Sequence, residues 1–222
     1  MKKLSIVANI KSYKNEVEAK EWLENFKKIK DLNLNPSDKE VIVCPSFTQL
    51  FSFHSFFSSN IITAYIGAQN VSPFEEGAYT GEVNAKQIKD FAKYVLIGHS
   101  ERRKNFGETG DMLVNKVEVS LKYELVPIFL VQGKDTPIPD GVKLIAYEPV
   151  FAIGTGNPDT PPNANFVSKA IKSVRPDTRV LYGGSVTSVN VRSFTEQPDI
   201  DGVLVGGSSL DAEEFIGIVK NA

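Results

Sequence analysis

Short runs of apolar residues, many of them Val, Ile and Leu, alternate along the chain with longer segments in which apolar residues recur every three or four positions. Most of the short runs lack a regular alternation of apolar and polar residues. That pattern is typical of strands that are covered on both faces in a parallel sheet. It predicts eight strands, at residues 5–9, 41–44, 61–66, 94–97, 126–131, 144–147, 179–182 and 202–205.

The segments between these runs have helical periodicity. In one of them the apolar residues lie near one face, with Lys and Glu on the other; they are Val17, Trp22, Phe26 and Ile29. A pair of prolines at 161–162 indicates a helix start, because the first helical positions need no backbone donor. The pattern predicts helices at residues 17–30, 84–92, 111–124, 163–173, 186–194 and 210–219.

Strands that alternate with helices predict an α/β fold, most simply a single (β/α)8 barrel domain over residues 1–222. A doubly wound open sheet has the same alternation, and the number of strands alone does not exclude it. One crossover differs from the others. Residues 132–141 contain two prolines and two glycines, which is too broken for a packed helix. We therefore expect a loop in place of the helix after the fifth strand.

Composition narrows the class of protein. A chain of 222 residues with 41% hydrophobic residues can bury a core without disulfides or a metal, and its single thiol, Cys44, fits a reducing cytosol. A net charge of −2 gives no electrostatic reason to expect nucleic acid or an anionic membrane as partner. The apolar stretch at residues 4–10 is short and contains Asn9, so we interpret it as a strand rather than a secretory signal. We expect a cytoplasmic protein.

Chemically active side chains follow three of the predicted strands. Asn9 and Lys11 come after the first strand, His99 and Glu101 after the fourth, and Glu148 after the sixth. In a parallel barrel the carboxyl ends of the strands form the active-site rim. An ammonium, an imidazole and a carboxylate on one rim predict acid–base catalysis.

Glycine-rich turns follow the last two predicted strands, at residues 183–185 and 206–208, and a further glycine, Gly154, lies in the loop after Glu148. Both turns precede predicted helices, and backbone N–H groups at such places bind phosphate. The residues alone therefore predict an enzyme that acts on a small phosphorylated substrate. We expect no metal or other cofactor, because no cluster has metal-ligand spacing.

Long stretches of the chain, at residues 97–103, 146–156, 182–186 and 201–207, resemble the signature motifs of the triosephosphate isomerase family. Residues 67–71 and 79–82 are similar to the third loop of that family. The resemblance runs from the first strand to the last in the family's order. It implies a TIM barrel that interconverts dihydroxyacetone phosphate and D-glyceraldehyde 3-phosphate in glycolysis and gluconeogenesis through an enediolate.

The resemblance also implies a role for each rim residue. Glu148 corresponds to the general base, and His99 to a neutral electrophile that shuttles protons between substrate oxygens. The N-terminus of a short following helix is expected to lower the pKa of His99. Lys11 would stabilise the developing negative charge, Asn9 would hold a substrate oxygen, and Glu101 would support the lysine.

Four positions match the phosphate-binding backbone of the family: Gly154, Ser185, Gly206 and Gly207. The loop after the base resembles a mobile lid, whose closure would exclude water and prevent elimination of phosphate. Its residues are Pro149, Val150, Phe151, Ala152, Ile153, Gly154, Thr155 and Gly156.

The chain departs from the family pattern in a few places. Leu130 and Gly133 replace a cysteine and a glutamate that is often paired with the arginine here numbered Arg103, which puts that ion pair in doubt. Ile10 and Phe151 replace tryptophans, and the far end of the lid reads Asn-Pro-Asp at 157–159, so its hinge is expected to differ.

The sequence also bears on the oligomeric state, on three other side chains and on competing functions. A full-length third loop with Thr80 at its tip implies a homodimer, with a tetramer as the alternative. Trp22, Cys44 and His54 are expected to be structural, with His54 on an aromatic helix face. Two competing functions stay open: another phosphate-binding barrel isomerase, and a non-catalytic relative that only binds phosphate.

Overall fold

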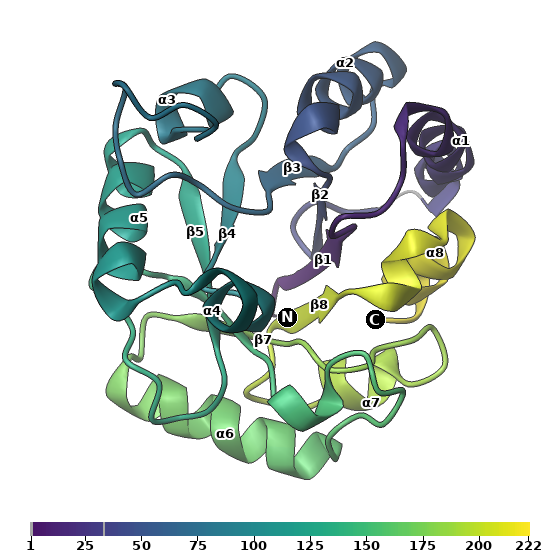
Figure 1. Cartoon of the computed structure of the whole chain (residues 1–222). Helices are drawn as coiled ribbons and strands as arrows, with labels where there is room; N and C mark the ends of the chain where they lie inside the picture. Colours follow the sequence, from purple (N-terminus) through teal and green to yellow (C-terminus); the bar gives the residue numbers. More distant parts are fainter. Residues whose placement is uncertain (1, 33) are drawn as a thin grey trace.

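Eight parallel strands close into a barrel in which each strand pairs with the next along the chain and β8 pairs with β1 (Figure 1). This computed structural model describes residues 2–32 and 34–222. The closed pairing confirms the (β/α)8 TIM barrel and excludes a doubly wound open sheet. The strands are β1 (Leu4–Asn9), β2 (Lys39–Cys44), β3 (Tyr65–Ala68), β4 (Tyr94–Ile97), β5 (Val126–Val131), β6 (Leu144–Tyr147), β7 (Arg179–Tyr182) and β8 (Gly202–Val205).

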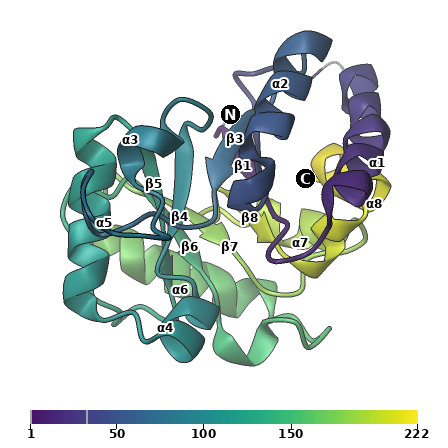
Figure 2. The same cartoon turned by 45° about the horizontal axis from the view of Figure 1, so that its top comes forward.

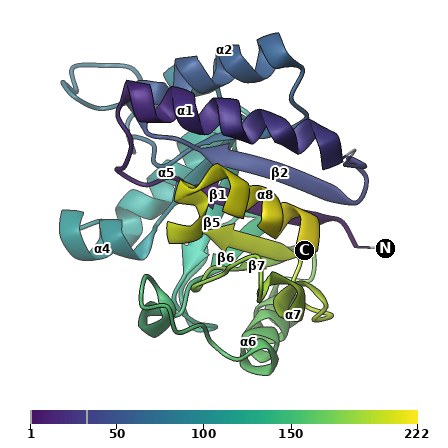
Figure 3. The same cartoon turned by 90° about the vertical axis from the view of Figure 1, so that its right-hand side faces the viewer.

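Helices surround the strands, and α1 and α8 lie side by side on one flank (Figures 2 and 3). Local chemistry begins several of them: Asn15 and Glu18 form a capping box at the start of α1, and Thr160 caps α6 just before a proline. Among the described residues no helix is long and apolar enough to cross a membrane. The helices are α1 (Glu16–Phe26), α2 (Leu50–Asn60), α3 (Ala85–Ile88), α4 (Ser100–Phe106), α5 (Gly110–Lys122), α6 (Pro161–Val174), α7 (Val191–Thr195) and α8 (Ala212–Asn221).

Two predicted elements are displaced. The third strand begins at Tyr65 rather than at residue 61, because Ile61 ends α2 in the left-handed region with φ of 53°. The helix predicted at 186–194 begins only at Val191. Before it, Thr187 and Asn190 exchange side-chain-to-backbone hydrogen bonds that form a turn instead of a helix.

The core has two layers. Alternate strand residues such as Val7, Leu96 and Leu181 fill the barrel interior, and Cys44 lies buried among them. The other strand residues pack against the helices, where Trp22 is buried and donates from Nε1 to the Ser209 carbonyl at 3.0 Å. His54 lies on α2 as expected.

A polar cluster closes the N-terminal end of the barrel, the end at which both chain termini lie (Figure 3). The carboxylate of Glu40 accepts hydrogen bonds from the Tyr94 hydroxyl at 2.8 Å and the Ser5 hydroxyl at 2.9 Å. Arg179 lies 3.4 Å from the same carboxylate and donates to Ser5 at 2.6 Å, while Lys3 lies 3.6 Å from it. We call these five residues the basal cluster.

The predicted loss of the helix after β5 is confirmed. Residues 132–143, which we call the strap, connect β5 to β6 without a helix. Val142 of the strap is buried, and so are all residues of both strands except Val126, which is partly exposed. Arg175, which follows α6, donates hydrogen bonds to the carbonyls of Ile138 and Pro139 and pairs with Asp140 at 3.7 Å. A guanidinium thus holds in place a segment that cannot form a helical hydrogen-bond ladder.

Candidate active site

Four of the predicted residues meet at the C-terminal end of the barrel. Asn9, Lys11, His99 and Glu148 line one pocket of about 570 Å³. The predicted phosphate-binding residues Gly154, Ser185, Gly206 and Gly207 line the same pocket. Strand closure therefore brings together residues that lie far apart in the sequence.

Glu148 and His99 form the centre of this site. The imidazole Nε2 lies 3.4 Å from Oε1 of Glu148, and both side chains are about 95% buried. The second carboxylate oxygen, Oε2, is buried and receives no hydrogen bond from any described residue. A Cβ at Gly183 would lie 2.8 Å from Cγ of Glu148, so a glycine there gives the carboxylate its room. Oε2 therefore has no hydrogen bond to give up before it accepts a proton.

The orientation of His99 is set by the start of α4. Its Nδ1 accepts a hydrogen bond from the Glu101 backbone N–H at 3.2 Å, so the proton of the neutral ring lies on Nε2 and faces Glu148. We expected a lowered pKa for His99, and burial does lower it. The carboxylates of Glu148 and Glu101 outweigh burial, however, and hold the pKa of His99 above its ordinary value. The expectation was wrong because it left out the neighbouring carboxylate.

Lys11 is held from three directions. Its backbone is in the left-handed region with φ of 56°, and its N–H donates to Oδ1 of Asn9 at 3.1 Å. Its ammonium lies 2.5 Å from Oε1 of Glu101, the residue predicted to support it. The side chain of Gln69 donates to the carbonyls of Lys11 and Cys44 at 2.9 Å each. Gln69 directly follows β3, but no role for it was predicted from the sequence.

The glycine-rich turns differ from the expectation in one respect. After β8 the predicted turn at 206–208 runs into a 3₁₀ helix, Gly207–Leu210, and α8, predicted from residue 210, begins at Ala212. After β7, in contrast, Ser185 is followed by the turn at Thr187–Asn190, and α7 begins later. The pocket is lined there by Gly183, Ser185 and Val186, and also by residues of this turn, including Asn190, the N-cap residue of α7.

The predicted lid lies beside the pocket as a loop with one helical turn at Val150–Ala152. Val150 and Phe151 are more than half exposed, while Ala152 is fully buried. The Ala152 carbonyl accepts a hydrogen bond from the Ser185 hydroxyl at 2.6 Å. The lid is thus fixed at its start and exposed beyond it.

Arg103 binds backbone carbonyls, because Gly133 stands where a glutamate partner was expected from the family pattern. Its guanidinium donates to the carbonyl of Gly98 at 2.7 Å and to that of Leu130 at 3.0 Å, and it lies over the Phe129 ring. Backbone acceptors therefore tie the His99 loop to β5 where the family often has an ion pair.

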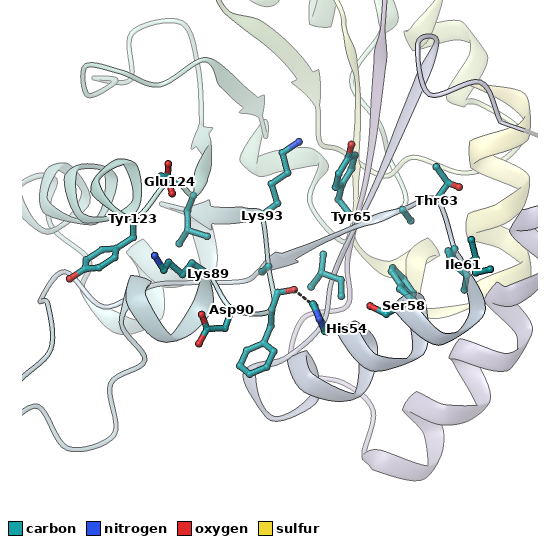
Figure 4. Close-up of a pocket in the computed structure, with 17 residues that line it drawn as sticks. His54, Ser58, Ile61, Thr63, Tyr65, Lys89, Asp90, Lys93, Tyr123 and Glu124 are labelled. Atoms are coloured by element: carbon teal, nitrogen blue, oxygen red, sulfur yellow. Dashed lines mark hydrogen bonds between the residues drawn. The ribbon is translucent and has the colours of Figure 1, made fainter.

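Another pocket, of about 750 Å³, lies near the N-terminal ends of β3 and β4 (Figure 4). Its ammonium groups face aromatic rings: Lys93 lies 4.2 Å from the Tyr65 centroid, and Lys89 lies 5.8 Å from that of Tyr123. Nδ1 of His54 faces the Phe91 carbonyl at 3.2 Å (Figure 4). Its imidazole has no carboxylate partner among the described residues, unlike that of His99.

Comparison with known proteins agrees with the geometry. The family model described as triosephosphate isomerase matches residues 4–137 and 139–222, and the break at 138 falls within the strap. A triosephosphate isomerase of Dictyoglomus turgidum is 38% identical over 254 aligned positions, covering all of both chains. Those of Trichormus variabilis and Mesomycoplasma hyopneumoniae are 37% and 38% identical, over 99% and 100% of both chains respectively.

The site combines a buried carboxylate–imidazole pair with a nearby lysine, at the C-terminal rim of an eight-stranded barrel. The family model matches nearly the whole chain. The chain belongs to the triosephosphate isomerase family.

Proposed function

We propose that the protein interconverts dihydroxyacetone phosphate and D-glyceraldehyde 3-phosphate. The observation that carries the proposal is the buried pair of Glu148 and His99, 3.4 Å apart, with Oε2 of Glu148 free to accept a proton. In this proposal Glu148 removes the proton from the carbon next to the carbonyl and returns it to the neighbouring carbon. His99 Nε2–H donates to the substrate oxygens.

We propose that His99 reacts as the neutral ring, because its Nδ1 accepts from the Glu101 N–H and the single ring proton is then on Nε2. The charge of Glu148 raises the pKa of the imidazole, whereas burial lowers it. When Glu148 takes the substrate proton, the negative charge moves from its carboxylate to the enediolate. Lys11 would offset the charge of the enediolate, and Asn9 would hold a substrate oxygen.

The proposed roles of the phosphate-binding residues and of the lid rest on where these residues lie around the pocket. Gly154, Ser185, Gly206 and Gly207 line the end of the pocket where backbone N–H groups would bind phosphate. Residues 149–156 would close over it as a lid. The reaction needs no cofactor.

We further propose a cytoplasmic homodimer. Loop 3 exposes Phe74 and Tyr79, whose rings stack at 4.3 Å, and Thr80 lies exposed beside them. An exposed stacked aromatic pair favours contact with another copy of the chain. Sedimentation at low micromolar concentration tests this: a fully active monomer would contradict it, and a tetramer would extend it.

A coupled assay with glyceraldehyde 3-phosphate tests the activity. Glu148→Asp and Lys11→Ala are each expected to lower kcat/KM by about two powers of ten or more, while Lys93→Ala, a matched loss of charge at the other pocket, should leave it unchanged. A folded wild type that binds phosphoglycolate without turnover would instead indicate a non-catalytic relative. Turnover of a different sugar phosphate alone would indicate another barrel isomerase.

A further inference from the structure

Asp159 is a buried carboxylate at the far end of the lid. It is only 7% exposed, whereas residues 154–158 just before it are all exposed. No ion pair among the described residues includes it. Because burying a carboxylate without a cation is costly, its hydrogen bonds must stabilise it.

Three donors converge on this carboxylate. The Tyr147 hydroxyl donates to Oδ2 at 3.3 Å, the Asn163 amide donates to Oδ2 at 2.7 Å, and the Thr160 backbone N–H donates to Oδ1 at 2.7 Å. The carboxylate also lies at the N-terminus of the 14-residue helix α6, where the helix dipole favours negative charge. One side chain thus joins the end of β6, which precedes Glu148, to the start of α6.

The backbone of Asp159 makes a second connection, to β7. Its N–H donates to the Tyr182 hydroxyl at 2.7 Å. A Cβ at Gly184 would lie 2.6 Å from that hydroxyl and 3.0 Å from Cβ of Ala152. Ala152 and Asp159, the buried residues on either side of the exposed lid segment, therefore both pack near the turn after β7. Gly183 and Ser185 of this turn line the active-site pocket.

We propose that the carboxylate of Asp159 is a positioning group that anchors the C-terminal hinge of the lid, so that residues 153–158 move between two fixed points and reach over Glu148. The inference rests on the proposed function for its catalytic consequence. Without the anchor, the lid would close less completely over the enediolate. The electron pair of an exposed enediolate can expel the phosphate by breaking the adjacent carbon–oxygen bond, which releases inorganic phosphate and leaves an enol that becomes methylglyoxal.

The test compares Asp159→Ala and Asp159→Asn with the wild type and with Asp177→Ala, which removes an acid that is 86% exposed. In Asp159→Ala we expect kcat/KM to fall about tenfold, mainly through KM, and phosphate release per turnover to rise about tenfold. Asp159→Asn should recover most of both, because the Tyr147 hydroxyl and the Asn163 amide can each exchange donor for acceptor. Asp177→Ala should match the wild type.

Hydrogen–deuterium exchange of residues 150–158, measured without substrate, separates this inference from the proposed function. We expect these amides to exchange about tenfold faster in Asp159→Ala than in Asp177→Ala. If the wild type turns nothing over, the proposed function fails and the exchange still decides the role of Asp159. Wild-type exchange of the lid in Asp159→Ala would overturn the anchor, even if the variant were less stable. Wild-type phosphate release in an active Asp159→Ala would overturn its role in closure.

Discussion

A cluster of ionisable side chains lies at each end of the barrel, and each is centred on a buried glutamate. At the N-terminal end both oxygens of Glu40 accept hydrogen bonds, and Arg179 and Lys3 lie close to them. At the C-terminal end Oε2 of Glu148 has no donor among the described residues, and the carboxylate opens onto the pocket beside His99. The same residue type is therefore fully satisfied at one end and left reactive at the other.

This difference shows how one barrel can separate stability from chemistry. A polar network whose members are all paired rigidifies a core, whereas a partly satisfied one costs free energy and is found at functional sites. The hydrogen bonds between neighbouring strands of the closed sheet fix the positions of the side chains at both ends of the barrel. Removing each glutamate in turn should therefore have opposite effects on activity and on stability.

The largest effect is expected for Glu148→Gln. Loss of the proposed base should lower kcat by about three powers of ten, equivalent to about 4 kcal/mol of transition-state stabilisation. The free energy of unfolding should stay the same or rise, because an amide at Oε2 is less costly to bury than a carboxylate. Assay and urea unfolding of the same preparation check both. A large loss of stability would show that Glu148 is part of the structural framework.

Glu40→Gln should show the opposite pattern. It leaves the Arg179 guanidinium, which is about one-third exposed, without its carboxylate, and should lower the free energy of unfolding by about 2 kcal/mol. Urea unfolding measures this loss. The kcat/KM of the folded variant should stay within about twofold of the wild type. A tenfold loss of activity at full stability would contradict the separation of the two ends.

The pH dependence of stability should also be linked to Glu40. Burial raises its pKa, but hydrogen bonds from Tyr94 and Ser5 and the charges of Lys3 and Arg179 lower it by more, so the folded-state pKa lies below the ordinary 4.5. The unfolded state therefore takes up the proton first as the pH falls. The stabilisation is complete above about pH 4.5 and is lost as the pH falls through the folded-state pKa.

Wild type and Glu40→Gln should thus differ in slope below about pH 4.5, by up to about 1.4 kcal/mol per pH unit. Urea unfolding at several pH values between 3 and 7 measures the slopes. Parallel curves would show that the basal cluster does not titrate on unfolding.

The smallest effect is expected for the strap, which runs from the C-terminal end of β5 to the N-terminal end of β6. Arg175→Ala removes the hydrogen bonds to Ile138 and Pro139 and should lower the free energy of unfolding by about 1 kcal/mol. Activity should not change, because these contacts lie near the N-terminal ends of the strands. Arg192→Ala, which removes an exposed i,i+4 pair, is the control. A loss of activity would mean that the strap couples the two ends.

The order of strands, the missing helix and the rim residues could be predicted from the sequence. Strand runs such as 126–131 are apolar throughout, and the broken composition of 132–141 allows no helix. The start of β3 could not be predicted, because the Ile-Ile-Thr-Ala sequence at 61–64 suits a strand as well as a helix end. Gln69 lay in the loop-3 motif and Asp159 at the altered far end of the lid, but the role of each depends on hydrogen-bond partners that only the fold supplies.

By itself, the sequence determined which side chains follow which strand, because local backbone periodicity places Asn9, His99 and Glu148 at strand ends. The tertiary structure alone decided how far apart they lie and what surrounds them. β4 and β6 are not neighbours in the sheet, but closure of the barrel brings their C-terminal ends together. Nε2 of His99 then lies 3.4 Å from Oε1 of Glu148. It also raised the pKa of His99 and buried Asp159, because electrostatics and burial depend on neighbours that only the folded chain supplies.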